Sequence, residues 1–354
     1  MKFGFILKKG LLVCFFSLYV CSCVIETVDE FAPKVEESGI GSNDFFYLID
    51  TNRNCYKPFL VKDNNIHIVI PNGMDVTKLK PVFTNGDVII ANDNNYSESD
   101  YVDFSDFYNF VTFIVRVEDG TEKEYSIQIY DLPVLQIDTP DSNPIISTTE
   151  RTECCKVKLS VSEGLTYTYS PADIRVRGNS TSLASKKPYS IKLWSAQSFL
   201  GMKASKKWVL LANAYYDRTQ LHNAVAFEIA RLTNYEWVQE GRFVELILNG
   251  EHRGLYYLCE KIDIEEGKID ISPNTGILLE SDVFIGSSGE ENSFITDYFN
   301  KTGFAFVDGA NYECGLGWFF KVPDEDVDER KIIDIKNYMN EMESLMYEDY
   351  SLDR

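Results

Sequence analysis

The sequence predicts an α+β protein in which an N-terminal immunoglobulin-like β-sandwich comes before a domain of mixed strands and helices. Short alternating strands recur between residues 44 and 131, with turn residues between them. From residue 132 to residue 354, strands are interleaved with two amphipathic helical patterns. Apolar residues make up 44% of the 354 residues and aromatic residues 14%, which is enough to fill two cores.

The chain carries a formal net charge of −21. A protein this acidic repels a nucleic-acid backbone, so nucleic acid is excluded as the main partner. The charge favours a soluble protein outside the cytoplasm, and it makes any local cluster of Lys and Arg conspicuous.

The first 22 residues have the pattern of an export signal. Basic residues precede a short apolar run over residues 10–20, which is too short to span a bilayer as a helix. Residues 20–23 resemble a lipobox with Cys23 as the lipidated residue; ordinary secretory cleavage without a lipid is the alternative. We therefore expect a lipid-anchored protein of the cell envelope, on the periplasmic or the cell-surface side. Residues 23–43 are acidic and aperiodic, which is typical of a tether.

Cysteine usage argues against a disulfide scaffold. Beyond the signal and Cys23, the chain has Cys55, Cys154, Cys155, Cys259 and Cys314. An odd number without paired CxxC spacing indicates neither a disulfide framework nor a zinc site, so we expect mostly free, buried thiols.

The N-terminal domain, residues 44–131, shows strand signals at short intervals. The expected strands are residues 66–70, 79–83, 87–91, 113–117 and 125–129. The last two form the clearest hairpin, because Asp119 and Gly120 between them supply the positive φ that a tight turn needs. No titratable cluster stands out here, so we interpret this domain as a spacer or a binding module.

The second domain alternates strands with helices. The expected strands are residues 134–139, 156–161, 190–193, 208–211, 243–248, 254–259 and 277–280. A first helix is predicted over 219–232, with Leu221, Val225, Ile229 and Leu232 on its apolar face. A second is predicted over 327–346, with an apolar face of Ile332, Ile335, Met339, Met342 and Met346.

A strand with a lysine, a helix with a glutamate and then two strands is the layout of a kinase-type small lobe. In that layout the lysine binds the nucleotide phosphates, and the glutamate forms an ion pair that positions the lysine. The candidates are Lys192, or Lys187 at the start of the strand, and Glu228. A buried ammonium needs an anionic partner; an outward-facing Lys192 on a half-exposed sheet is the alternative.

Residues 175–181, followed by Lys186 and Lys187, form the most basic stretch of the chain. Backbone N–H groups, hydroxyls and guanidinium groups in such a loop can bind phosphates. A solvated turn is the alternative, since neither of the established glycine-rich phosphate loops is present. Asp217 is a candidate site residue as well as a helix cap. The three histidines are scattered, so no metal ligands are assigned.

Several short motifs, in this order and spacing, resemble the spore-coat protein H (CotH) kinase family. They are Arg177-Gly178-Asn179-Ser180-Thr181, Lys186-Lys187-Pro188-Tyr189, Lys192, Leu200-Gly201-Met202, Lys207-Trp208-Val209-Leu210, Asp217-Arg218-Thr219, Asn223, Asn249-Gly250-Glu251, Gly254-Leu255-Tyr256 and Glu260. The resemblance begins near residue 133. The sandwich and the lipoprotein signal before it look like the arrangement of Bacteroidetes envelope members.

The resemblance implies an atypical protein-kinase fold that uses ATP and Mg or Mn to phosphorylate proteins. A protein substrate or an envelope partner is therefore expected. Matched to the motifs, Arg177, Lys187 and Lys192 would serve phosphates, with Glu228 as the partner of a lysine by analogy with kinases. The implied nucleotide site also includes Asn179, Ser180, Asp217 and Glu260.

The chain departs from the family pattern at several points. Ser182 stands where the family has Trp, and His222 stands where it has Arg. The catalytic and metal-binding aspartates of the family lie further on, one of them in a Trp-Asp motif that this sequence lacks. We therefore expect an incomplete kinase-like domain with weak or no activity, either a truncated gene product or a non-catalytic remnant. The alternative function is a non-catalytic surface binding or scaffolding lipoprotein.

Overall fold

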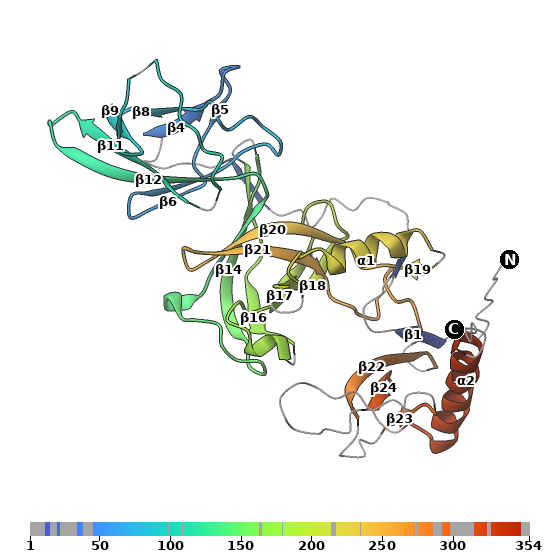
Figure 1. Cartoon of the computed structure of the whole chain (residues 1–354). Helices are drawn as coiled ribbons and strands as arrows, with labels where there is room; N and C mark the ends of the chain where they lie inside the picture. The colour runs from blue at the N-terminus through green and yellow to red at the C-terminus, as the bar shows by residue number, and fades with distance from the viewer. Residues whose placement is uncertain are drawn as a thin grey trace, which may run out of the picture. The chain divides into compact units, whose positions relative to one another are not determined.

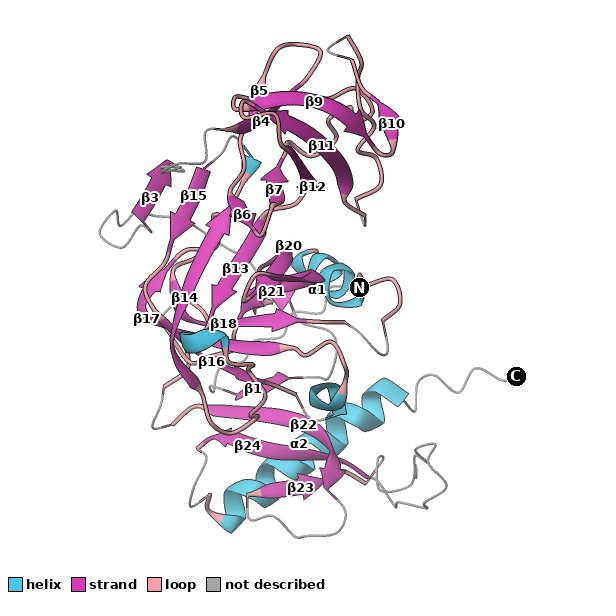
Figure 2. Cartoon of the chain, turned by 90° about the vertical axis from the view of Figure 1, so that its left-hand side faces the viewer, coloured by secondary structure: helices cyan, strands magenta, loops and turns pink. Residues whose placement is uncertain are grey.

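The computed structural model describes residues 11–14, 20–21, 34–37, 45–97, 99–107, 109–162, 165–178, 180–213, 217–233, 235–265, 267–272, 275–285, 292–297, 315–323 and 327–347. These residues form mostly β-sheet, with two α-helices (Figures 1 and 2). Internal contacts divide the chain into a larger unit, residues 25–222 and 240–261, and a smaller unit, residues 1–24, 223–239 and 262–354. The predicted lipidation site Cys23 and most of the predicted signal and tether lie outside the described residues.

Two β-sheets with a shared core form the N-terminal part of the larger unit. Their strands are β4 (Phe46–Ile49), β5 (Cys55–Tyr56), β6 (Leu60–Lys62), β7 (Asn65–Val69), β8 (Lys80–Phe83), β9 (Gly86–Ala91), β10 (Asn94–Asn95), β11 (Val111–Val117) and β12 (Glu122–Tyr130). The six-stranded sheet has the order β10-β9-β11-β12-β7-β6 and the three-stranded sheet the order β5-β4-β8. Each of the five strands expected here is present, and Phe46 of one sheet shares a core with Phe113 of the other.

The predicted hairpin is confirmed. β11 and β12 pair antiparallel, with Phe113 opposite Tyr125. Gly120 adopts a φ of +82°, which an L side chain rarely accepts, and the Thr121 N–H donates to Asp119 Oδ1 over 2.8 Å. The Asp-Gly pair thus fixes the register of the hairpin.

A closed barrel forms the rest of the larger unit. Its strands are β13 (Val134–Asp138), β14 (Thr152–Ser160), β16 (Ala172–Val176), β17 (Tyr189–Gln197), β18 (Ser205–Leu211), β20 (Gly241–Leu248) and β21 (Glu251–Glu260). β13 pairs in parallel with β20 and antiparallel with β14, which closes the order β13-β20-β21-β18-β17-β16-β14. β15 (Leu165–Thr168) and β3 (Lys34–Glu37) extend the sheet beyond β14, and 3-10 turns span Pro140–Ser142 and Ser180–Leu183.

The barrel interior is a packed core. Alternate residues of its strands are buried in one cluster, for example Ile191 of β17, Trp208 of β18 and Leu258 of β21. Trp208 has no exposed surface, and its ring stands edge-on to Phe199 at 4.9 Å. Because successive strand residues face opposite sides, the residues between these are directed out of the barrel.

The smaller unit holds both helices. Its elements are β1 (Leu11–Cys14), β2 (Val20–Cys21), α1 (His222–Arg231), β19 (Glu236–Trp237), β22 (Ile277–Ile285), β23 (Ser293–Ile295), β24 (Gly315–Val322) and α2 (Glu329–Tyr347). Its sheets have the orders β1-β22-β24-β23 and β19-β2. α2 confirms the second predicted helix and buries Ile335 and Met339 against Trp318 of β24. Neither helix is long and apolar enough, in the part of the chain that is described, to cross a membrane.

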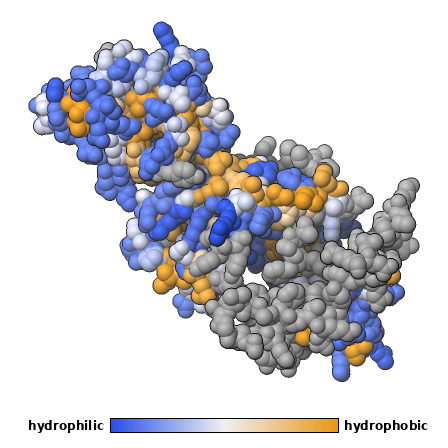
Figure 3. Space-filling view, viewed as in Figure 1, coloured by the Kyte–Doolittle hydropathy of each residue, from blue (hydrophilic) through white to orange (hydrophobic). Residues whose placement is uncertain are grey.

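Two expectations about burial are wrong. The predicted apolar face of α1 is exposed, from 48% at Leu221 to 86% at Leu232, whereas Phe227 and Ala230 are buried. Figure 3 shows hydrophobic surface over this helix. The described cysteines are free as expected, but Cys55 and Cys154 are exposed and only Cys155 and Cys259 are buried. Cys154 is exposed because it sits at an irregularity of the β14–β16 pairing, with a φ of +57°.

Candidate functional site

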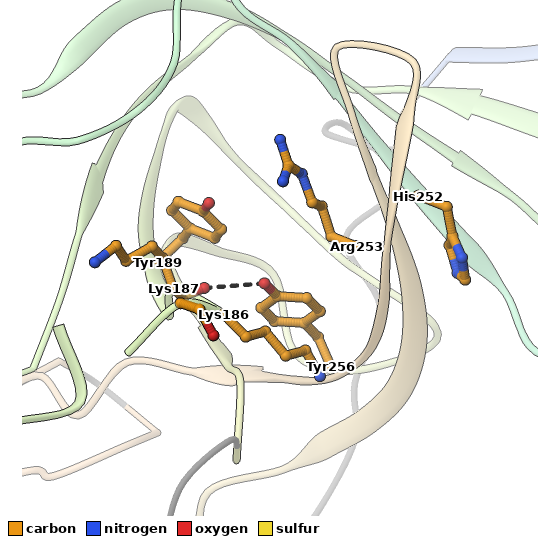
Figure 4. A pocket seen from close by; sticks show the side chains of 7 residues that line it. Lys186, Lys187, Tyr189, His252, Arg253 and Tyr256 are labelled. Carbon is orange, nitrogen blue, oxygen red and sulfur yellow. Dashed lines mark hydrogen bonds between the residues drawn. The ribbon is translucent and has the colours of Figure 1, made fainter. Parts of the chain in front are cut away.

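A cavity of about 320 Å³ opens where β16 ends and β17 begins, at one end of the barrel (Figure 4). We call it the basic cavity. It is lined by Ser185, Lys186, Lys187, Tyr189, His252, Arg253 and Tyr256. The first four residues belong to the segment that enters β17, and the last three belong to β21.

The two lysines are held by the backbone. Lys186 Nζ donates to the Leu255 carbonyl and lies 4.6 Å from the centre of the Tyr256 ring. Lys187 Nζ donates to the Ser182 carbonyl of the 3-10 turn over 2.7 Å. Among the described residues, neither ammonium group forms an ion pair. Because carbonyl partners leave the positive charge uncompensated, the cavity attracts anions.

Two tyrosines form the apolar wall. The rings of Tyr189 and Tyr256 stack with centroids 6.3 Å apart, and the Tyr256 hydroxyl donates to the Lys187 carbonyl over 3.0 Å. Burial raises the pKa of both phenols, so both remain neutral hydrogen-bond donors near pH 7. Burial also lowers the pKa of Lys186, although the nearby Glu245 carboxylate acts in the opposite direction.

Arg253 reaches the cavity because of a β-bulge. The β20–β21 pairing joins Leu246 to Gly254 and Ile247 to His252, which leaves Arg253 as the extra residue. Gly254 has a φ of +79°, a conformation that favours glycine. In Figure 4 the side chains of Arg253 and His252 leave the strand in opposite directions. Arg253 bonds to Glu251 over 2.7 Å, and His252 Nε2 lies 2.8 Å from Glu245.

Of the predicted nucleotide-binding residues, Lys187 is the one that lines this cavity. Lys192 is exposed on β17, opposite Lys207 and Asp173 on the neighbouring strands. It is an odd number of residues from Tyr189, so it faces away from the cavity. The expectation of a buried lysine with an anionic partner is therefore wrong, and the outward-facing alternative is the one observed.

The basic loop lies only partly within the described structure. Asn179 is outside the described residues, and Ser180 begins the 3-10 turn. The Arg177 backbone N–H donates to the Pro188 carbonyl over 3.0 Å, which fixes the loop beside the start of β17. Burial raises the pKa of the Cys259 thiol to about 12, against a lowering effect of Arg177 and a further raising effect of Glu260. Arg177 and Glu260 are thus near enough to Cys259 to affect its pKa, and neither is among the residues that line the basic cavity.

The remaining predicted residues have structural partners. Asp217 accepts hydrogen bonds from the Thr219 hydroxyl over 2.6 Å and from the His222 N–H over 2.7 Å, which caps the start of α1. Glu228 is exposed and pairs with Arg231 of the same helix. Glu260 is 2% exposed, and its Oε2 accepts from the Glu240 N–H over 3.4 Å.

Sequence reasoning did not assign Arg253, Tyr189, Tyr256 or His252 to a site, and it noted Lys186 only as a neighbour. The glycine of the Gly254-Leu255-Tyr256 motif was the available signal, because a bulge glycine re-aims the residue before it. No group of three or more His, Cys, Asp or Glu side chains that could hold a metal ion is found in the described residues.

Fold and cavity together define a mostly β-sheet protein with a basic site at the end of a filled barrel. Residues 174–349 match the family model described as CotH kinase protein, so this part of the chain belongs to the CotH kinase family. The match includes Lys186, Lys187, Arg253 and the two cavity tyrosines, and it confirms the resemblance drawn from the motifs. A search of curated proteins found no match to the chain.

Proposed function

We propose that the basic cavity binds the phosphate groups of a nucleotide, as part of a CotH kinase domain. The observation that carries this proposal is that Lys186, Lys187 and Arg253 line one cavity of a protein with a net charge of −21. Such a local reversal of sign raises the local concentration of anions.

Each cation suits a phosphate in a different way. Arg253 offers a planar fork for two phosphate oxygens, and its present partner, Glu251, is 67% exposed and readily exchanged. Lys186 and Lys187, which line the same cavity, act as point charges. A volume of about 320 Å³ is at the small end for ligand cavities, and both tyrosine rings are already stacked. The cavity therefore suits a polyphosphate better than a nucleobase.

The family activity is ATP-dependent phosphorylation of proteins with Mg or Mn, on an atypical kinase fold. For this chain we propose weak transfer or none, because no Trp in the sequence is followed by Asp. Phosphoryl transfer depends on carboxylates that hold the metal and orient the acceptor. We further propose an envelope lipoprotein anchored through Cys23, whose N-terminal sheets form an immunoglobulin-like sandwich.

A non-catalytic binding or scaffolding lipoprotein is the second candidate function. It is favoured by the exposed apolar residues of α1, since such a stripe is typical of a surface that meets another protein.

The first experiment measures binding of ATP to residues 24–354 by calorimetry, with and without Mg or Mn. Lys187→Ala and Arg253→Ala should each weaken binding about tenfold, the loss of one charge-assisted hydrogen bond. Lys192→Ala is the matched control, because it removes the same charge from the opposite face of β17, and it should leave affinity unchanged. Equal losses of ATP affinity in Lys187→Ala and Lys192→Ala would contradict this assignment. They would indicate that the face of β17 that carries Lys192 also binds ATP, as the sequence predicted.

Two further arms define the ligand and the activity. Tripolyphosphate should compete with ATP and adenosine should not, whereas the opposite result would make the cavity a base site. Incubation with radiolabelled ATP, Mg or Mn and acidic or Ser-rich proteins should give little transfer. Robust labelling would overturn the proposal of weak activity, and no ATP binding at all would favour the scaffolding function.

A further inference from the structure

The N-terminal sheets contact the hairpin that carries the cavity residues. Val69 and Tyr130 from these sheets are buried in one cluster with Val134 of β13 and Ile247 of β20. Lys62 Nζ also donates to the Asn249 carbonyl, at the turn of the hairpin, over 3.1 Å. All of these residues belong to the larger unit.

At the centre of this contact is a hydrogen-bond chain with a fixed direction. The Tyr130 hydroxyl donates to Gln128 Oε1 over 2.9 Å, and the Gln128 amide donates to the Phe107 carbonyl. Since the hydroxyl has only one hydrogen, it must accept at the 2.8 Å contact with His67 Nδ1. His67 therefore carries a hydrogen on Nδ1, and the phenol is held from two sides.

Tyr130 presents its ring to the cavity strand. The ring stands edge-on to the imidazole of His252, with centroids 5.4 Å apart. His252 is held in turn by Glu245 of β20, and the next residue is Arg253. A continuous series of contacts therefore leads from the N-terminal sheets, through Tyr130 and His252, to the residue before Arg253 of the basic cavity.

Within this part of β21, Tyr256 is buried in the barrel core, whereas residues 251–255 are not part of that core. β21 pairs with β18 only through residues 257–260, so residues 251–256 pair with β20 alone among the described strands. On the free edge, Lys186 bonds to the Leu255 carbonyl. A strand segment paired on one side takes its position from whatever packs on it.

We propose that Tyr130 is a positioning residue for the basic cavity, and that the N-terminal sheets set the placement of Arg253 rather than acting as a separate spacer. The ligand part of this inference rests on the proposed function. The structural part, that Tyr130 restrains residues 251–256 of β21, does not depend on any ligand.

The test compares Tyr130→Leu with Phe113→Leu, which removes an aromatic ring from the core of the same sheets but not from the contact. In residues 24–354, Tyr130→Leu should weaken ATP binding about tenfold, because a site loosened by an ångström loses much of its affinity. It should also speed amide hydrogen exchange over residues 251–256. Phe113→Leu should lower Tm while leaving both quantities at their wild-type values.

Tyr130→Phe keeps the ring against His252 and should restore most of the ATP affinity. Unchanged exchange and unchanged affinity in Tyr130→Leu would overturn the proposal, as would equal effects of Tyr130→Leu and Phe113→Leu. If wild-type protein binds no ATP, the proposed function fails, and faster exchange in Tyr130→Leu alone still supports the restraint.

Discussion

Arg253 holds the carboxylate of Glu251 at 2.7 Å on the exposed edge of β21, beside the basic cavity. The two side chains are 42% and 67% exposed, so the pair is weak and an incoming phosphate competes with Glu251 for the guanidinium. Glu251 therefore lowers the affinity of the cavity for a phosphate group.

Glu251→Gln should tighten ATP binding by about two- to fivefold, the equivalent of a weak exposed ion pair. Calorimetry on residues 24–354 measures the change. Glu122→Gln is the matched control, because Glu122 forms a similar exposed pair with Arg116 on the β11–β12 hairpin. A gain of the same size in the control would assign the effect to net charge instead of competition.

Asp217→Ala should destabilise the protein by about 1–2 kcal/mol, the usual loss for a helix cap. Burial acts to raise the pKa of Asp217, but hydrogen bonds from Thr219 and His222 prevail and lower it. Its stabilising effect is therefore present above the unfolded pKa and is lost as the pH falls through the folded pKa. Denaturant unfolding at pH 7 and pH 3 measures this, with Arg218→Ala as a neighbouring control. Unchanged stability together with weaker ATP binding would make Asp217 a ligand contact.

His67 should make the protein less stable in mild acid. Burial, helped by His252 nearby, lowers the pKa of His67 from 6.5 to about 4. The unfolded chain then takes up the proton first, so stability falls as the pH drops from about 6.5 to about 4, by about 3 kcal/mol at most. His67→Gln can still donate to Tyr130 and should flatten this pH profile. If the unfolding midpoint of His67→Gln depends on pH in the same way as that of the wild type, His67 is not the cause of the loss of stability in acid.

Glu343→Gln should raise Tm near neutral pH. Burial raises the pKa of this carboxyl, although the neighbouring Thr296 and Trp318 act to lower it. Its contribution is favourable below the unfolded pKa and is lost as the pH rises through the folded pKa. The gain in Tm should thus be larger at pH 8 than at pH 4. Glu341→Gln, an exposed site on α2, should show no such gain.

Local patterns predicted the local structure well. The Asp119-Gly120 turn and the alternation of residues 113–117 are visible in the sequence, and the hairpin has the predicted pairing. Closure of the barrel was not predictable in this way. It depends on β13 meeting both β14 and β20, and the β13–β20 pairing joins residues more than 100 positions apart.

A small part of the candidate site could be predicted from the sequence. The Lys186-Lys187-Pro188-Tyr189 motif pointed to Lys187, and the cavity contains it. Lys192 was ambiguous because a lysine in an apolar strand can face either side, and only the register of β17 decides. Arg253 was missed because a bulge breaks the alternation on which strand reasoning rests.

The pairing of β13 has a practical consequence for dissecting the protein. The segment that matches the family begins at residue 174, whereas β13 and β14 lie before it, at Val134–Asp138 and Thr152–Ser160. A fragment cut at residue 174 would leave β20 and β16 with bare edges, which pair with other chains and aggregate. The smallest soluble piece of this barrel therefore starts ahead of Val134, about 40 residues before the match to the family model begins.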